Sequence, residues 1–157
     1  MSEEVSDDLL VVRRLRRENF ELTPAWRAMF GKAFGDESTY CAKPPSRFYV
    51  ERLLADHSFI AIAATMGAEV IGGAAAYELR KFEQERSEIY LYDLAVDERY
   101  RRRGVARAMI SRLQEIARDS GAWVIFVQAD HGDTAAIDLY ESYGPREEVL
   151  HFDIPPG

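Results

Sequence analysis

An arginine-rich turn has the residue types and spacing of an anion-binding site. Segment 89–96 before it is rich in aromatic and branched residues, typical of a strand, and the apolar residues of 105–121 return at helical spacing. A strand therefore leads directly into a helix N-terminus, whose unpaired N–H groups and dipole attract anions. The turn and the first helical residues are Arg101, Arg102, Arg103, Gly104, Val105 and Ala106. Because Gly104 permits close approach to the backbone, we expect a phosphate or pyrophosphate there.

The alternative is a solvated turn whose arginines only offset Asp97 and Glu98, as most short charged runs do. Agreement between strand, turn, glycine and helix favours phosphate binding. The spacing matches neither the Walker pattern nor the three-glycine dinucleotide fingerprint, so neither a P-loop enzyme nor a Rossmann dehydrogenase is indicated.

A carboxylate interrupts the apolar pattern of the strand before the turn. Asp93 follows Ile89 and Leu91 at a position where strict alternation predicts an apolar residue. It is a candidate general base or an anchor for a cationic group, although its ordinary pKa of about 3.9 makes it a poor base unless burial raises that value. The alternative is a structural carboxylate paired with an arginine of the turn.

The acidic residues are unevenly distributed. The chain has 157 residues, with 20 basic and 27 acidic side chains and a formal charge of −7, which disfavours nucleic-acid binding. Residues 128–157 carry a surplus of acids, so we expect a cationic substrate. The candidate substrate-binding residues are Asp36, Tyr92, Asp93, Asp130 and Asp153.

The remaining composition limits the class of protein. The length predicts one domain, 1–157, with a mobile tail at 1–8. The single cysteine, Cys41, excludes an internal disulfide framework, and the scattered histidines predict no metal site. The chain has no long apolar run, and its acidic N-terminus is unlike a signal peptide, so we expect a cytoplasmic protein that does not bind membranes.

The elements that position these residues follow from periodicity and turn signals. We expect an α/β sheet with helices on both faces, in the order strand, two helices, three strands, helix, strand, helix, strand. The first strand starts at 9–12, and Thr23 and Ser46 are the expected N-caps of the first two helices. The other expected elements are a hairpin at 59–65 and 69–78, the central strand and helix, a buried strand at 123–129, a helix at 135–143 and a last strand around 149–151.

The turn resembles the Gln/Arg-x-x-Gly-x-Gly/Ala motif of the GNAT acetyltransferase superfamily. The flanking segments 81–96, 127–130 and 146–154 resemble the aminoglycoside 3-N-acetyltransferases, and the likeness covers nearly all the chain from Phe34 onward. The resemblance implies a mixed, mostly antiparallel sheet in a single domain, with a splayed strand pair that holds acetyl-CoA. The sequence departs from the family pattern at Pro145, where many members carry an aromatic residue.

The resemblance also implies roles for individual residues. Backbone amides of the turn would hold the pyrophosphate, and a bulge would aim an N–H of Ala95 or Val96 at the thioester oxygen. Tyr140 would protonate the departing thiolate, although a tyrosine on an amphipathic helix is otherwise usually core packing. Leu94 and Ala136 complete the expected cofactor-binding set.

The resulting functional hypothesis is acetyl-CoA-dependent acetylation of an aminoglycoside, at the 3-amino group, giving antibiotic resistance. One alternative is acetylation of another polyamine or small amine by the same residues. An alternative of a different class is a non-catalytic acetyl-CoA-binding module. A homodimer is left open.

Overall fold

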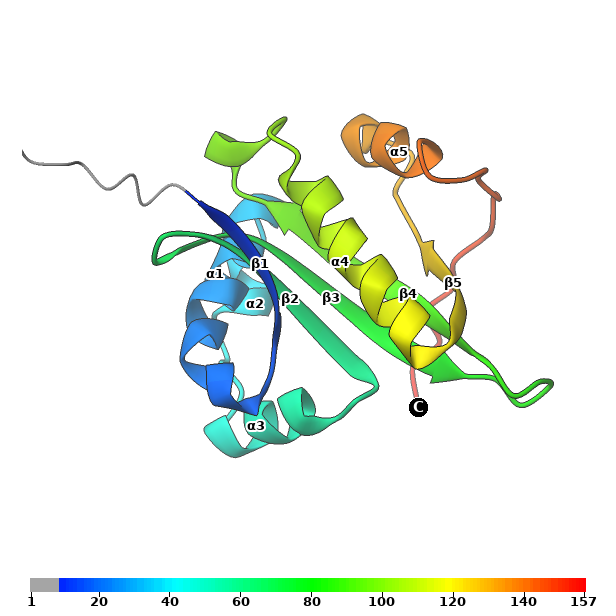
Figure 1. Ribbon diagram of the computed structural model, residues 1–157, viewed down its shortest axis with the longest axis horizontal. Coiled ribbons are helices and arrows are strands. Elements are labelled where there is room, and N and C mark those ends of the chain that lie inside the picture. Colours follow the sequence, from blue (N-terminus) through cyan, green and yellow to red (C-terminus); the bar gives the residue numbers. More distant parts are fainter. Residues whose placement is uncertain (1–8) are drawn as a thin grey trace, which may run out of the picture. The chain divides into compact units, whose positions relative to one another are not determined.

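The computed structural model describes residues 9–157, so the tail expected at 1–8 lies outside the described residues. The chain divides into two compact units, one ending at Phe126 and one running from Val127 to Gly157, and each is described by itself. The strands form a five-stranded sheet in the order β1-β2-β3-β4-β5 (Figure 1). Their bounds are β1 Leu10–Leu15, β2 Phe59–Met66, β3 Glu69–Arg80, β4 Ser87–Val96 and β5 Ala122–Val127.

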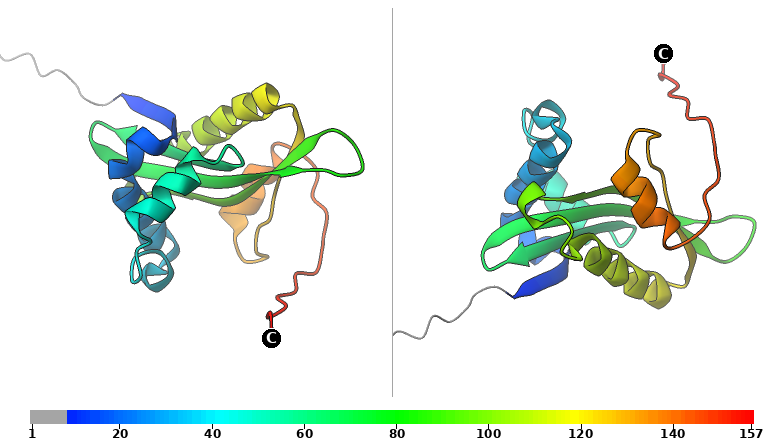
Figure 2. Two further views of the ribbon diagram at one scale, coloured as in Figure 1. Left: turned by 90° about the horizontal axis from the view of Figure 1, so that it is seen from below. Right: turned by 90° about the horizontal axis from the view of Figure 1, so that it is seen from above.

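Strands β1 to β4 pair antiparallel in chain order, so the sheet is mostly antiparallel. The α-helices are α1 Thr23–Phe34, α2 Glu37–Tyr40, α3 Arg47–Ala55, α4 Val105–Ser120 and, in the second unit, α5 Thr134–Glu141. The 3-10 helix η1 Arg17–Leu22 precedes α1, and the 3-10 helix η2 Glu98–Tyr100 precedes the arginine-rich turn. Within the first unit, α1 and α3 lie on one side of the sheet and α4 on the other (Figure 2).

Two adjacent glycines of β3 mark the two faces. A Cβ on Gly72 would lie 3.1 Å from both Met109 and Val105 of α4. A Cβ on Gly73 would lie 2.7 Å from the Trp26 indole nitrogen, which donates a 2.8 Å hydrogen bond to the Ile62 carbonyl. Because successive side chains alternate across a strand, the Gly72 face is covered by α4 and the Gly73 face by α1.

The structure confirms several local predictions. The hairpin turns between Met66 and Glu69, and α1 ends at Gly35, which has a left-handed backbone (φ 63°). Ser46 caps α3, because its side chain accepts a hydrogen bond from the Tyr49 amide.

Three expectations about elements are wrong. Thr23 does not cap α1: Leu22 is the N-cap, and the Thr23 hydroxyl donates to the Phe20 carbonyl instead. Strand β5 is not buried, since Trp123 is 55% exposed. No strand forms around 149–151, where alternating apolar residues have no ladder partner, and alternation alone cannot make a strand.

Candidate active site

The arginine-rich turn has the geometry of an anion cradle. Arg102 (φ 62°) and Gly104 (φ 78°) both have left-handed backbones, and Gly104 is the N-cap of α4. No side chain caps this helix, and a Cβ placed on Gly104 would meet no atom within 4 Å. Because the N-terminal amides lack a side-chain acceptor and the space beside Gly104 is open, the turn fits a phosphate group.

The charges of the turn are divided between two groups of arginines. Arg99 forms ion pairs with Glu69 and Asp97, and its hydrogen bonds lower the pKa of Asp97 to about 2. The exposed Arg101, Arg102 and Arg103 take part in none of the ion pairs of residues 9–157. Arg99 therefore offsets nearby acids, as the solvated-turn alternative expects of the arginines. Arg101, Arg102 and Arg103 instead keep a positive charge that is available to an anion.

A β-bulge in β4 changes the expected position of Asp93. Leu91 lies opposite Ala76, but Asp93 lies opposite Ala75, so Tyr92 is the extra residue without a partner on β3. Asp93 consequently lies on the α1 face, opposite to the face of Ile89 and Leu91. Placing it on the same side as those residues by simple alternation was wrong, because one extra residue reverses the pleat.

The same register corrects the expected bulge near Ala95. The irregularity lies at Tyr92, while Leu94, Ala95 and Val96 pair regularly with Ala74, Gly73 and Gly72. Leu94 and Val96 thus share the α4 face, and Ala95 is buried on the α1 face.

Asp93 is half-buried and has one hydrogen-bond partner in the described structure. The Tyr40 hydroxyl on α2 donates to its Oδ2 oxygen over 3.1 Å. Burial raises the pKa of Asp93 above its usual value, and the Tyr40 hydrogen bond opposes this change. None of the ion pairs of residues 9–157 includes Asp93, so the expected alternative of pairing with an arginine of the turn is not found.

Aromatic rings surround this carboxylate on the same face. Tyr92 is 60% exposed and makes edge-on contacts with Tyr77 and Tyr90, with ring centroids 6.0 and 5.4 Å apart. Tyr90 in turn stacks on Phe126 of β5 at 4.6 Å. The face therefore presents aromatic surface beside a carboxylate that has no counterion among the residues the structure describes, a combination suited to a cationic ligand with apolar edges.

The structure brings together only some of the predicted site residues. Asp93, Tyr92 and Asp36 belong to the first unit, but Asp36 caps α2 through hydrogen bonds from the Thr39 amide (3.2 Å) and the Ser38 hydroxyl (3.0 Å). Its substrate-binding role stays a prediction. Tyr40 was missed as a site residue, because nothing in the sequence connects it with an acid 53 positions away.

The remaining predicted residues belong to the second unit. Ala136 and Tyr140 lie on α5, where Asp133 caps the helix by accepting a 3.1 Å hydrogen bond from the Ala136 amide. Burial, with a smaller contribution from Asp133, raises the pKa of Tyr140 to about 12. This tyrosine is therefore protonated at neutral pH, as an acid must be. Asp130 and Asp153 are exposed, and Asp153 contacts the His151 ring at 2.9 Å.

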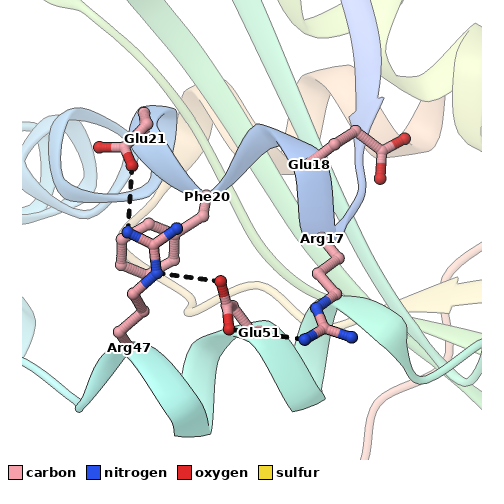
Figure 3. Close-up of a pocket in the computed structure, with 6 residues that line it drawn as sticks. All are labelled: Arg17, Glu18, Phe20, Glu21, Arg47 and Glu51. Atoms are coloured by element: carbon pink, nitrogen blue, oxygen red, sulfur yellow. Dashed lines mark hydrogen bonds and ion pairs between the residues drawn. The ribbon is translucent and has the colours of Figure 1, made fainter.

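A surface hollow of about 360 Å³ lies between η1 and α3 (Figure 3). Arg47 crosses it, with hydrogen bonds to Glu51 (3.0 Å) and Glu21 (3.4 Å) and its guanidinium 4.5 Å from the centre of the Phe20 ring. Since these charges compensate one another and no predicted site residue lines the hollow, we interpret it as a structural ion-pair cluster.

Across 9–157, no three His, Cys, Asp or Glu side chains are grouped so that they could hold a metal ion. The helices of the same range are all too short or too polar to cross a membrane.

The fold and the turn define the class of protein. Residues 19–144 match the model of the Acetyltransferase (GNAT) family, and the chain belongs to this family. The family uses acetyl-CoA.

Two solved structures resemble the chain over nearly its whole length. An aminoglycoside acetyltransferase from an uncultured soil metagenomic sample is 52% identical, with a TM-score of 0.93 over 95% of this chain and 99% of that one. A second aminoglycoside acetyltransferase from such a sample, in complex with sisomicin, is 27% identical, with a TM-score of 0.85 over 94% and 97%.

A curated relative is more distant. N-acetyltransferase 8B of Rattus norvegicus is 23% identical over 133 residues, which are 85% of this chain and 60% of that protein. The chain thus spans about three fifths of the length of this relative.

Proposed function

We propose that the protein transfers an acetyl group from acetyl-CoA to an amino group of an aminoglycoside, at the 3-amino position, and so confers resistance. The observation that carries this proposal is Asp93, a half-buried carboxylate that has a tyrosine hydroxyl but, among residues 9–157, no cation paired with it. A carboxylate in that setting favours a ligand that brings its own positive charge. The names of the two full-length structural neighbours support an aminoglycoside as that ligand.

The residues of the chain divide the reaction between them. Bound acetyl-CoA supplies the acetyl thioester, and the amides around Gly104 with Arg101 to Arg103 fit its pyrophosphate. Asp93 binds the substrate ammonium and accepts one proton from it, because its raised pKa makes it a better base than an exposed aspartate, and the neutral amine then attacks the thioester carbonyl. The excess proton on the new amide nitrogen is released to solvent. Tyr140 donates a proton to the departing thiolate. Tyr92 and its aromatic neighbours contact the sugar rings, whose C–H faces are apolar.

Product identity tests the proposal. The protein is incubated with acetyl-CoA and, separately, with gentamicin, sisomicin and linear polyamines, and the acetylated nitrogen is located by mass spectrometry and NMR. We expect one acetyl group on the 3-amino nitrogen of the aminoglycosides. Products formed only from polyamines would overturn the substrate class, and acetyl-CoA binding without any product would identify a non-catalytic module.

The same assay tests the acid. Tyr140→Phe should lower kcat by roughly 10²-fold or more, with little change in the KM of the amine, because its hydroxyl is needed only by the leaving group. Wild-type turnover in this variant would return Tyr140 to a packing role.

A further inference from the structure

The short helix α2 brings one hydroxyl to the proposed base. It begins two residues after the left-handed Gly35, and the Asp36 amide donates a 2.9 Å hydrogen bond back to the Gly31 carbonyl of α1. Asp36 then caps α2 through its side chain. These bonds hold α2 against the end of α1. The position of Tyr40, the last residue of α2, is therefore fixed relative to α1.

Packing against α1 fixes the Tyr40 ring. It stacks on Phe30, with ring centroids 5.8 Å apart and planes 19° from parallel, and contacts Phe34 at the same centroid distance. A Cβ on Gly31 would lie only 3.3 Å from the Tyr40 Cβ, so this close approach depends on glycine. A ring held on two sides leaves its hydroxyl little freedom, and the hydroxyl points to Asp93 Oδ2.

The proton of this hydrogen bond stays on Tyr40. Burial, and then the Asp93 charge, raise the pKa of Tyr40 well above its ordinary value, so the hydroxyl remains a donor at neutral pH. One donor occupies Oδ2, and Oδ1 remains as the oxygen available to an amine.

We propose that Tyr40 is a positioning residue for the acetyl transfer: its hydroxyl holds Oδ2 of Asp93 so that Oδ1 is presented to the substrate amine. This inference rests on the proposed function, since it assigns Asp93 the role of base. It deepens that function by extending the site from β4 to α2, whose N-cap, Asp36, had been the only candidate in this part of the chain.

The groups around Asp93 indicate how its pKa should change when the Tyr40 hydroxyl is removed. The titratable groups that act on Asp93 or on its tyrosine neighbours are Asp36, Tyr40, Tyr49, Tyr77, Tyr90 and Tyr92. None of these groups is a lysine, arginine or histidine side chain, and Tyr40 is the one of them that lowers the pKa of Asp93 by a hydrogen bond. Its removal should therefore raise that pKa, while no cation in this group compensates.

The experiment uses Tyr40→Phe and, as a matched control, Tyr49→Phe, which removes the same hydroxyl from the 60% exposed Tyr49 of α3. Two quantities are measured for each: the pH profile of kcat/KM for sisomicin and the Asp93 titration followed by carboxyl ¹³C NMR. In Tyr40→Phe we expect the Asp93 pKa and the acidic limb of the profile to move upward together. We also expect kcat/KM to fall about tenfold to a hundredfold, the range for a hydrogen bond to a charged group.

Each outcome has one meaning. An unchanged Asp93 titration in a folded Tyr40→Phe protein would overturn the inference, and so would an equal shift in Tyr49→Phe. If the wild-type protein acetylated no aminoglycoside, the proposed function would fall by itself. The NMR titration would then still decide whether Tyr40 controls this carboxylate.

Discussion

At the scale of single residues, Asp93 combines a cost to folding with a use in chemistry. Its carboxylate is half-buried and forms no ion pair with another residue of 9–157, and its pKa is raised by burial despite the Tyr40 hydrogen bond. A side chain that is unfavourable for the folded state but useful for binding a cation is typical of functional sites. The protein should therefore gain stability when this charge is removed.

Asp93→Asn should accordingly raise the melting temperature at neutral pH. A folded-state pKa above the unfolded value of about 3.9 means that the ionised form disfavours folding. This penalty is absent below the unfolded pKa and develops as the pH rises through the folded pKa. We expect Tm to increase on the order of 2–4 °C at pH 7.5, with a smaller difference at pH 3.5. A thermal-unfolding difference that is constant between these pH values would contradict the assignment.

At the scale of elements, helix α4 has two ends that are similar in backbone but different in use. Gly104 at its start has φ 78° and Gly121 at its end has φ 79°, and a Cβ at either would meet nothing within 4 Å. The helix buries one face, which includes Met109 and Leu113, against the sheet. The C-terminal glycine only ends the helix, whereas the N-terminal one also opens the amides to a ligand.

This symmetry provides a matched pair of variants. Gly104→Val and Gly121→Val impose the same left-handed strain on a side chain, so each should cost at least about 1–2 kcal/mol of stability. Only Gly104→Val should also lower the affinity for coenzyme A, by about tenfold or more, because the methyl groups of the valine enter the space beside the helix amides. Isothermal titration with coenzyme A measures this difference. Equal affinity in the two folded variants would place the pyrophosphate elsewhere.

At the scale of the whole molecule, the distribution of charge separates two kinds of ligand. The chain has a formal charge of −7, yet within the described part of the chain the exposed Arg101 to Arg103 form no ion pair and neither does Asp93. An anionic cofactor and a cationic substrate can therefore each find a complementary region on an acidic protein.

Salt should affect these two ligands unequally. Screening shortens the reach of charge interactions to about 8 Å at physiological ionic strength, so the KM of a polycationic aminoglycoside should rise several-fold between low and high salt. The affinity of coenzyme A should change less, because directed backbone amides contribute to its binding. Steady-state kinetics and titration across a NaCl series, repeated with a monoamine, would measure both. An aminoglycoside KM independent of salt would contradict a substrate held by carboxylates.

The sequence by itself determined the elements whose signals are local. The α4 turn, the Ser46 cap, the hairpin and the end of α1 at Gly35 follow from periodicity and from residues that favour particular backbone angles. The family resemblance likewise depends on contiguous residues, and the family match over 19–144 confirms its GNAT part.

Only the tertiary structure decided on which face of the sheet Asp93 lies and what contacts it. A bulge depends on the register between β3 and β4, and one extra residue, Tyr92, reverses the alternation that the sequence alone predicts. The Tyr40 contact depends on α1 packing across the sheet, which joins residues 53 positions apart. The strand expected around 149–151 was wrong for a related reason: a strand needs a hydrogen-bonded neighbour, and pairing is a property of the folded chain rather than of a segment.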